Sequence, residues 1–177
     1  MRVFLGIPIP PGLAGDLYAC TSGLRDALSG VSWVKPQNYH ITMLFLGELE
    51  PEEIERIKKV MKSLRIDGGA QANLGHIGQF PPRGAARVIY AGLDAGADAC
   101  RSAYSAVCGA IPEYAEKRRY IPHITLGRVK RGRRLLLGRE QKAMLPEKTF
   151  SLEEIVLYRS VLRQSGAEYH RLYSKVL

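Results

Sequence analysis

The chain has 177 residues, of which 46% are hydrophobic and 24% charged, and its net charge at pH 7 is +9. This length suffices for one domain with a buried core, and the composition is that of a globular protein rather than a disordered one. No apolar run approaches the roughly 20 residues that a membrane-spanning helix needs. The sequence therefore argues against a disordered chain and against a membrane-embedded one.

The positive charge is concentrated in one segment. Residues 117–142 contain ten basic residues and one acidic residue, a balance of +9, whereas residues 1–116 and 143–177 have balances of −1 and +1. A local excess of this size predicts attraction and orientation of a polyanion such as nucleic acid.

The chain has three cysteines, Cys20, Cys100 and Cys108, and no Cys-x-x-Cys motif. An odd number of cysteines without paired spacing favours neither a disulfide framework nor a zinc site. We expect the thiols to be small core residues of a protein in the reducing cytoplasm.

In the first half of the chain, two predicted strands alternate with two predicted helices. Residues 2–9 are apolar and end in prolines, which predicts a buried first strand rather than a signal peptide. Apolar residues at helical spacing predict helices over 12–28 and 51–64, the second with acidic residues in its first turn and lysines near its end. Between them, residues 39–47 predict a second strand.

A comparable run follows in the second half. The predicted elements are strands over 70–80 and 87–93 that form a hairpin, a helix over 94–110, a strand over 121–129, a short helix over 135–144, and strands over 150–158 and 169–176. No Gly/Ser-rich or Pro-rich linker separates the halves. We predict an α+β fold in which residues 1–177 form a single domain of two similar, interleaved lobes, with the strands over 39–47 and 121–129 facing each other across a central groove.

Two short segments are nearly identical: His40-Ile41-Thr42 and His123-Ile124-Thr125. Residues two apart on a strand project from the same face, so each segment presents an imidazole and a hydroxyl to one surface. The isoleucine between them points into the core. Two such pairs can meet at one cleft.

This set of groups suits acid–base chemistry at phosphorus. One imidazole can remove a proton from the attacking oxygen while the other protonates the leaving oxygen. The hydroxyls of Thr42 and Thr125 can donate hydrogen bonds to the non-bridging oxygens, and the guanidinium of Arg128 can contact the phosphate. Arg128 lies beyond the expected end of its strand.

We expect neither a metal nor another cofactor. The sequence has four histidines and no carboxylate cluster or paired cysteines near either motif, so a complete ligand set is hard to assemble. Without a metal, a strained cyclic phosphate is the natural substrate. His76 and His170 lack a repeated partner, and we expect them to be structural or surface residues.

At these residues the sequence resembles the two-histidine phosphoesterase superfamily, and within it the RNA 2′,3′-cyclic phosphodiesterases, also known as 2′–5′ RNA ligases. The first motif of that family matches residues 40–47 with Met43 in place of Leu, and the second matches residues 122–128 without change. The resemblance covers the whole chain. It implies a bilobal α+β fold with a pseudo-twofold axis.

The resemblance also implies a reaction and roles for individual residues. The enzyme would open an RNA-terminal 2′,3′-cyclic phosphate to a 2′-phosphate without a metal, with His123 as general base and His40 as general acid. Thr42, Thr125 and Arg128 would bind phosphate, and Phe45 would stack on the terminal base.

Partners and alternatives follow from the same reading. The expected substrate is an RNA with a cyclic phosphate end, tRNA fragments being one candidate, and the expected state is a monomer with no membrane partner. A basic rim, Lys130, Arg131, Arg133 and Arg134, is predicted to steer the RNA. The alternatives are the reverse reaction, 2′–5′ RNA ligation, and an RNA-binding module without catalysis.

Overall fold

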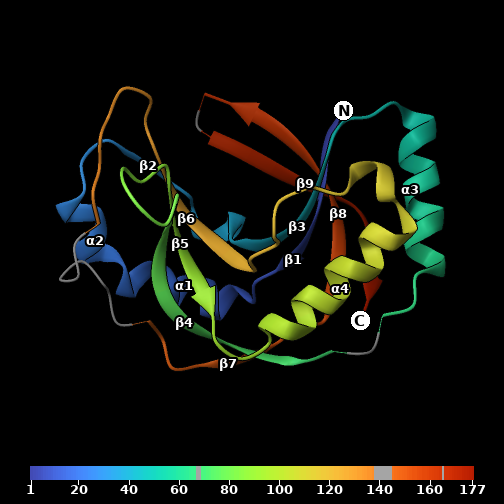
Figure 1. Cartoon of the computed structure of the whole chain (residues 1–177), viewed down its shortest axis with the longest axis horizontal. Helices are drawn as coiled ribbons and strands as arrows, with labels where there is room; N and C mark the ends of the chain where they lie inside the picture. Colours follow the sequence, from blue (N-terminus) through green and yellow to red (C-terminus); the bar gives the residue numbers. More distant parts are fainter. Residues whose placement is uncertain (67–68, 138–144, 165) are drawn as a thin grey trace.

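A computed structural model describes residues 1–66, 69–137, 145–164 and 166–177, and in it the strands form one continuous antiparallel sheet (Figure 1). The strands are β1 (Arg2–Pro8), β2 (Val31–Trp33), β3 (His40–Glu48), β4 (Gln71–Phe80), β5 (Val88–Leu93), β6 (His123–Val129), β7 (Thr149–Ser151), β8 (Glu154–Arg163) and β9 (Gly166–Val176). The helices are α1 (Pro11–Cys20), α2 (Ser22–Ala27), α3 (Pro51–Ser63) and α4 (Ala97–Ala110), with 3₁₀ turns η1 (Pro36–Asn38) and η2 (Pro112–Tyr114).

The strand order places the two motif strands side by side at the centre of the sheet. The order is β7-β4-β5-β6-β3-β1-β8-β9, and β2 pairs with β6 off this path. Three strands therefore flank β3 on one side, and three flank β6 on the other, which gives the sheet two similar halves. The predicted α+β fold with two pseudo-symmetric lobes is confirmed, and the lobes share one sheet at the junction of β3 and β6.

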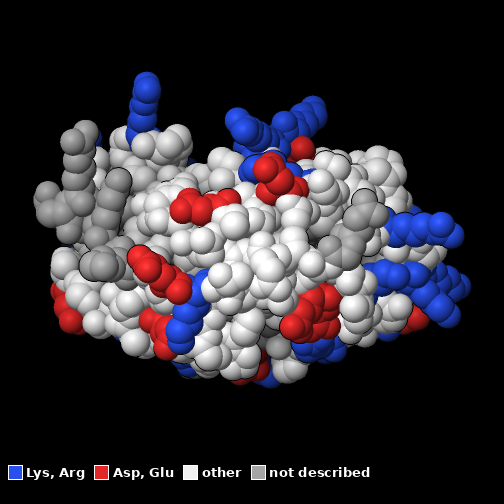
Figure 2. Space-filling model, turned by 90° about the horizontal axis from the view of Figure 1, so that it is seen from below, with Lys and Arg blue, Asp and Glu red and all other residues white. Residues whose placement is uncertain are grey.

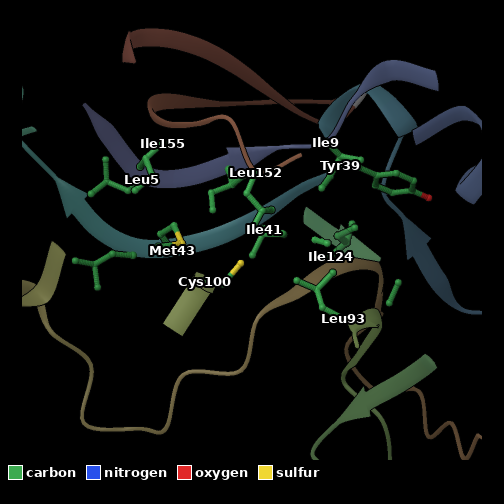
Figure 3. Packing of buried hydrophobic residues seen from close by; sticks show 14 of the residues in the cluster. Leu5, Ile9, Tyr39, Ile41, Met43, Leu93, Cys100, Ile124, Leu152 and Ile155 are labelled. Carbon is green, nitrogen blue, oxygen red and sulfur yellow. The ribbon is translucent and has the colours of Figure 1, made fainter. Parts of the chain in front are cut away.

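The core lies on the face of the sheet that the helices cover. Ile41 of β3 and Ile124 of β6 are fully buried antiparallel partners, and Figure 3 shows them together with Met43 of β3 and Cys100 of α4. Burying this apolar face stabilises the fold, because each fully buried Ile or Leu side chain contributes about 1.5–3 kcal/mol. The opposite face of β3 and β6 carries the histidines and threonines.

The helix predicted over residues 12–28 is interrupted at Thr21. The hydroxyl of this buried residue donates to the main-chain oxygen of Leu17 at 2.8 Å, and α1 ends one residue before it. Threonine hydroxyls compete with main-chain donors for carbonyls in this way and often bend or end helices. The predicted helix over 51–64 is confirmed as α3, with Pro51 at its first position.

The end of the chain differs more from the predictions. The strand predicted over 150–158 is divided into β7 and β8, and β8 and β9 extend further than predicted to form a long hairpin. The helix predicted over 135–144 lies mostly outside the described residues, and 135–137 are not helical. Cys100 is buried, as predicted, whereas Cys20 is exposed at the end of α1, so the prediction of three core thiols is wrong for this residue.

None of the helices in the described part of the chain is both long and apolar enough to cross a membrane.

Close packing of β2 on β6 depends on Gly127. Trp33 and Gly127 are cross-strand partners. A Cβ atom at position 127 would lie 2.6 Å from Cγ1 of Val31 and 2.9 Å from Cε3 of Trp33. Only glycine allows this approach without displacing the tryptophan, which lines the site described below.

We expect Gly127→Ala to lower the free energy of unfolding by about 1–3 kcal/mol, because the added methyl group overpacks the contact between β2 and β6. Urea denaturation followed by circular dichroism measures the change. Gly109→Ala in α4 is the matched control, since its Cβ would meet no atom within 4 Å and alanine favours helix. Equal stability of the Gly127→Ala variant and the native protein would contradict the packing argument.

Candidate active site

The two motifs meet because their central residues, Ile41 and Ile124, are antiparallel partners. In this register the threonine of each motif lies across from the histidine of the other, on the face opposite the isoleucines. The two histidines are then diagonal neighbours, whose separation in such a ladder is about 7–8 Å between Cα atoms. The structure brings together the two imidazoles and two hydroxyls that the sequence predicts.

A bulge in β3 brings Phe45 to the same face as the motif. Cross-strand pairing with β1 is interrupted between the partners of Leu5 and Gly6, and both Met43 and Leu44 are buried as a consequence. The extra residue shifts the alternation of the strand by one position. Phe45, five residues after His40, therefore points to the functional face and is 46% exposed.

The second motif strand has a bulge at the equivalent place. The pairing of β6 with β5 is shifted between Thr125 and Gly127, and Leu126 and Gly127 are both buried. Arg128, five residues after His123, is thereby brought to the functional face. It is part of β6, as the strand predicted over 121–129 implies, and the separate expectation that it lies beyond the strand end is wrong.

A groove of about 630 Å³ lies beside these residues. Four of the five predicted catalytic and phosphate-binding residues line it: His40, Thr42, Thr125 and Arg128. The fifth, His123, lies next to the groove as the cross-strand neighbour of Thr42. Phe45 also lines the groove, and further lining comes from residues 32–35 and from the β8–β9 hairpin.

Hydrogen bonds to main-chain oxygens fix the orientation of both imidazoles. Nδ1 of His40 donates to the oxygen of Asn38 at 2.8 Å, and Nδ1 of His123 donates to the oxygen of Ile121 at 2.7 Å. A carbonyl oxygen can only accept, so Nδ1 carries the proton in each ring. Nε2 of each neutral ring is therefore free to accept a proton, and that of His40 accepts from the Thr42 hydroxyl at 3.0 Å.

Asn38 links His40 to the far side of the groove. Its main-chain oxygen holds the imidazole, and its side-chain nitrogen donates to the oxygen of Ala167 in β9 at 2.7 Å. The position of the hairpin and the orientation of His40 thus depend on the same residue. The sequence argument missed Asn38, whose only local signal is its place two residues before the histidine.

Each histidine is enclosed by aromatic rings. The ring centroids lie at 4.9 Å (Phe4) and 5.2 Å (Tyr169) from His40, and at 4.9 Å (Phe80) and 5.2 Å (Tyr90) from His123. These rings limit the rotation of the imidazoles and exclude water from one side of each.

Burial, the largest effect, lowers the pKa of His40 to about 4. The hydrogen bond to Asn38 opposes this change, and the positive charges of His123 and Arg128 lower the pKa further. The pKa of His123 is also lowered, first by burial and then by Arg128, against its hydrogen bond to Ile121. Both imidazoles are therefore predominantly neutral at neutral pH in the free protein.

The predicted basic rim lies directly after β6. Its segment is held by hydrogen bonds from Lys130 to the oxygen of Gly30 and from Ala86 to the oxygen of Leu135. None of the four rim residues, Lys130, Arg131, Arg133 and Arg134, lines the groove. Arg139 and Lys142, which follow the rim along the chain, lie outside the described residues.

Charged side chains and histidines also lie outside the groove and the basic rim. Most of the face shown in Figure 2 is uncharged, Asp and Glu are scattered over it, and many basic side chains gather at the end where Figure 1 places α3. His76 and His170 are both exposed, as predicted for surface residues.

The chain is similar to a known family of phosphoesterases. Residues 7–90 match the sequence model of the family described as LigT-like phosphoesterase. An RNA 2′,3′-cyclic phosphodiesterase of Aeropyrum pernix is 31% identical over 85% of this chain and 90% of its own length. Another, of Methanocaldococcus jannaschii, is 29% identical over 96% of each chain.

A solved structure has the same fold. A protein of Thermus thermophilus superimposes with a TM-score of 0.82 at 25% sequence identity, covering 100% of this chain and 98% of that one. The fold is therefore shared over nearly the full length of both proteins.

We expect the His40 imidazole to titrate with a midpoint near pH 4, because burial disfavours the imidazolium form. As its folded-state pKa lies below the unfolded value of about 6.5, the unfolded chain binds the proton first, and this group destabilises the fold as the pH falls from 6.5 towards 4. NMR of the imidazole resonances, with His40→Gln for assignment, measures the midpoint. A midpoint at 6.5 would show that water reaches the ring freely.

Proposed function

The chain belongs to the LigT-like phosphoesterase family, and we propose that it hydrolyses RNA-terminal 2′,3′-cyclic phosphate to a 2′-phosphate without a metal ion. The observation that carries the proposal is the pairing of the two motifs, which sets two imidazoles and two threonine hydroxyls on one face of the sheet beside a groove. The names of the curated relatives support the same reaction.

In this proposal Nε2 of His123 removes a proton from water, whose oxygen attacks phosphorus. The bond from phosphorus to the 3′ oxygen breaks, and Nε2 of His40 gives that oxygen a proton, leaving a 2′-phosphate and a 3′-hydroxyl. Thr42, Thr125 and Arg128 donate to the non-bridging oxygens, where charge develops. The proton gained by His123 and lost by His40 is exchanged with solvent between turnovers.

The division of roles is supported by the position of Phe45. The ring of Phe4 contacts both Phe45 and His40, with centroid distances of 6.0 and 4.9 Å, whereas His123 is enclosed by Phe80 and Tyr90. A base stacked on Phe45 brings its ribose, and with it the leaving 3′ oxygen, to the side of His40. In-line attack then comes from the opposite side, which is that of His123.

The low pKa of His40 does not oppose its role as an acid. A bound phosphate carries negative charge next to the imidazole, and an opposite charge within about 4–6 Å favours the protonated form. Substrate binding would therefore supply the protonation state that the free site disfavours. The proton is held only when the leaving group is present.

We also propose that the basic rim contributes affinity for RNA that extends beyond the groove. The support is its position, since the rim follows β6 directly and lies next to Gly30, at the start of the segment that enters β2. Contacts from this segment would be electrostatic and independent of sequence, as phosphate contacts generally are.

The first test is an assay with a short RNA that ends in a 2′,3′-cyclic phosphate, carried out in EDTA. We expect full activity and a 2′-phosphate product, with losses of at least about 100-fold in His40→Ala and in His123→Ala, because general acid–base catalysis contributes about that much or more. The two possible products have the same mass. Treatment with a phosphatase that removes the phosphate from only one of the two positions, followed by mass spectrometry, identifies the product. Activity that disappears in EDTA, or a 3′-phosphate product, would contradict the proposal.

The same assay with an added 5′-hydroxyl RNA tests the reverse reaction, because joining of the two RNAs would show 2′–5′ ligation. If the substrate is bound tightly but is not cleaved, the result favours an RNA-binding module without catalysis.

The roles of the histidines are separated by a substrate with sulfur in place of the leaving 3′ oxygen. A thiolate leaves without protonation, so we expect this substrate to restore most of the activity of His40→Ala and none of that of His123→Ala. Single-turnover rates on the oxygen and sulfur substrates measure the effect. Recovery in the His123→Ala variant alone would reverse the assignment.

A further inference from the structure

The groove contains cations that the reaction proposed above does not use. Arg2, at the start of β1, and Lys35, directly before η1, line the same groove as Arg128. Among the described residues that line it, none is an aspartate or glutamate. Within the described part of the chain, these three cations also form no salt bridge.

The carboxylate nearest to Arg2 along the sheet has another partner. Glu48 is the cross-strand neighbour of Arg2, but its carboxylate pairs with the amino group of Met1 at 3.6 Å and does not line the groove. The guanidinium of Arg2 thus faces a groove without a competing anion. Such a position favours binding of a ligand phosphate.

Tyr169 connects Arg2 to the catalytic residues. Its ring contacts that of His40 edge-on, at 5.2 Å and an interplanar angle of 89°. Burial raises the pKa of the Tyr169 hydroxyl, and the positive charges of Arg128 and Arg2 act against this rise. Tyr169, Arg128 and Arg2 all line the same groove, so the two guanidinium groups and the hydroxyl face one space.

The distance along the sheet from the first motif to Arg2 exceeds the size of one nucleotide. Thr42 of the first motif pairs with Gly6, and Glu48 pairs with Arg2, so four residue steps of β1, about 13 Å, separate Arg2 from the level of the first motif. Phe45 lies between them. With the reacting phosphate at Thr42 and the terminal base on Phe45, Arg2 is placed to reach the backbone upstream of the terminal nucleotide.

We propose that Arg2 binds the phosphodiester upstream of the terminal nucleotide, and that the preferred substrate is an oligonucleotide rather than a mononucleoside cyclic phosphate. This inference rests on the proposed function, because it takes the reacting phosphate to be bound at the two motifs. It assigns the groove to a single RNA strand whose 3′ end enters first.

The test compares a mononucleoside 2′,3′-cyclic phosphate with a dinucleotide that ends in the same group. We expect Arg2→Gln to lower kcat/KM for the dinucleotide by about tenfold, because one cation that binds a phosphate is removed, and to change that for the mononucleoside less than twofold. The salt dependence for the dinucleotide should weaken by about 0.7 in the slope of the logarithmic plot for each phosphate that is no longer neutralised. Arg2→Lys should retain most of the preference.

Arg65→Gln is the matched control, since Arg65 is exposed after α3 and does not line the groove. Equal losses on the two substrates, or an unchanged dinucleotide rate in Arg2→Gln, would overturn the proposal. If the native protein cleaves neither substrate, the proposed function fails by itself. Fluorescence titration with a labelled dinucleotide 3′-phosphate then tests the subsite separately. Weaker binding to the Arg2→Gln variant, with unchanged binding to Arg65→Gln, would support the subsite, and equal binding to both variants would overturn it.

Discussion

The site depends on one backbone pairing, that of Ile41 with Ile124. This pairing joins the two halves of the sheet and determines the register of the two motifs. A shift by one residue would turn the histidines and threonines of one strand into the core and the isoleucine out to solvent. Because both isoleucines are fully buried, such a shift would expose apolar surface and bury unpaired polar groups. The hydrophobic core therefore maintains the geometry of the polar face.

The sequence predicts the parts of this arrangement that follow from alternation. The isoleucines and the polar residues on either side of them obey the period of two, so the predictions for His40, Thr42, His123 and Thr125 required only local reasoning. Phe45 and Arg128 do not obey it, because each lies an odd number of residues after its histidine. Their presence on the functional face results from bulges in β3 and β6, and a bulge depends on the neighbouring strand as well as on the local sequence.

Long-range contacts explain what else was missed. Tyr169 and Ala167 belong to the last strand and reach the site only because β8 pairs with β1 and β9 with β8. No local pattern reveals that order of strands. The division of the predicted helix at Thr21 is a different case, since a single buried hydroxyl decided between two conformations that the apolar spacing could not distinguish.

The two motifs are alike up to the threonine and differ at the position that the bulge exposes. In one half that position carries an aromatic ring, Phe45, and in the other a cation, Arg128. A symmetric pair of motifs could bind a phosphate in either direction, because each half offers the same imidazole and the same hydroxyl. The aromatic ring attracts a base and the guanidinium attracts a charge, so the difference between them gives the bound phosphate one favoured orientation. Chemically similar histidines can thus take opposite roles through residues five positions further along their strands.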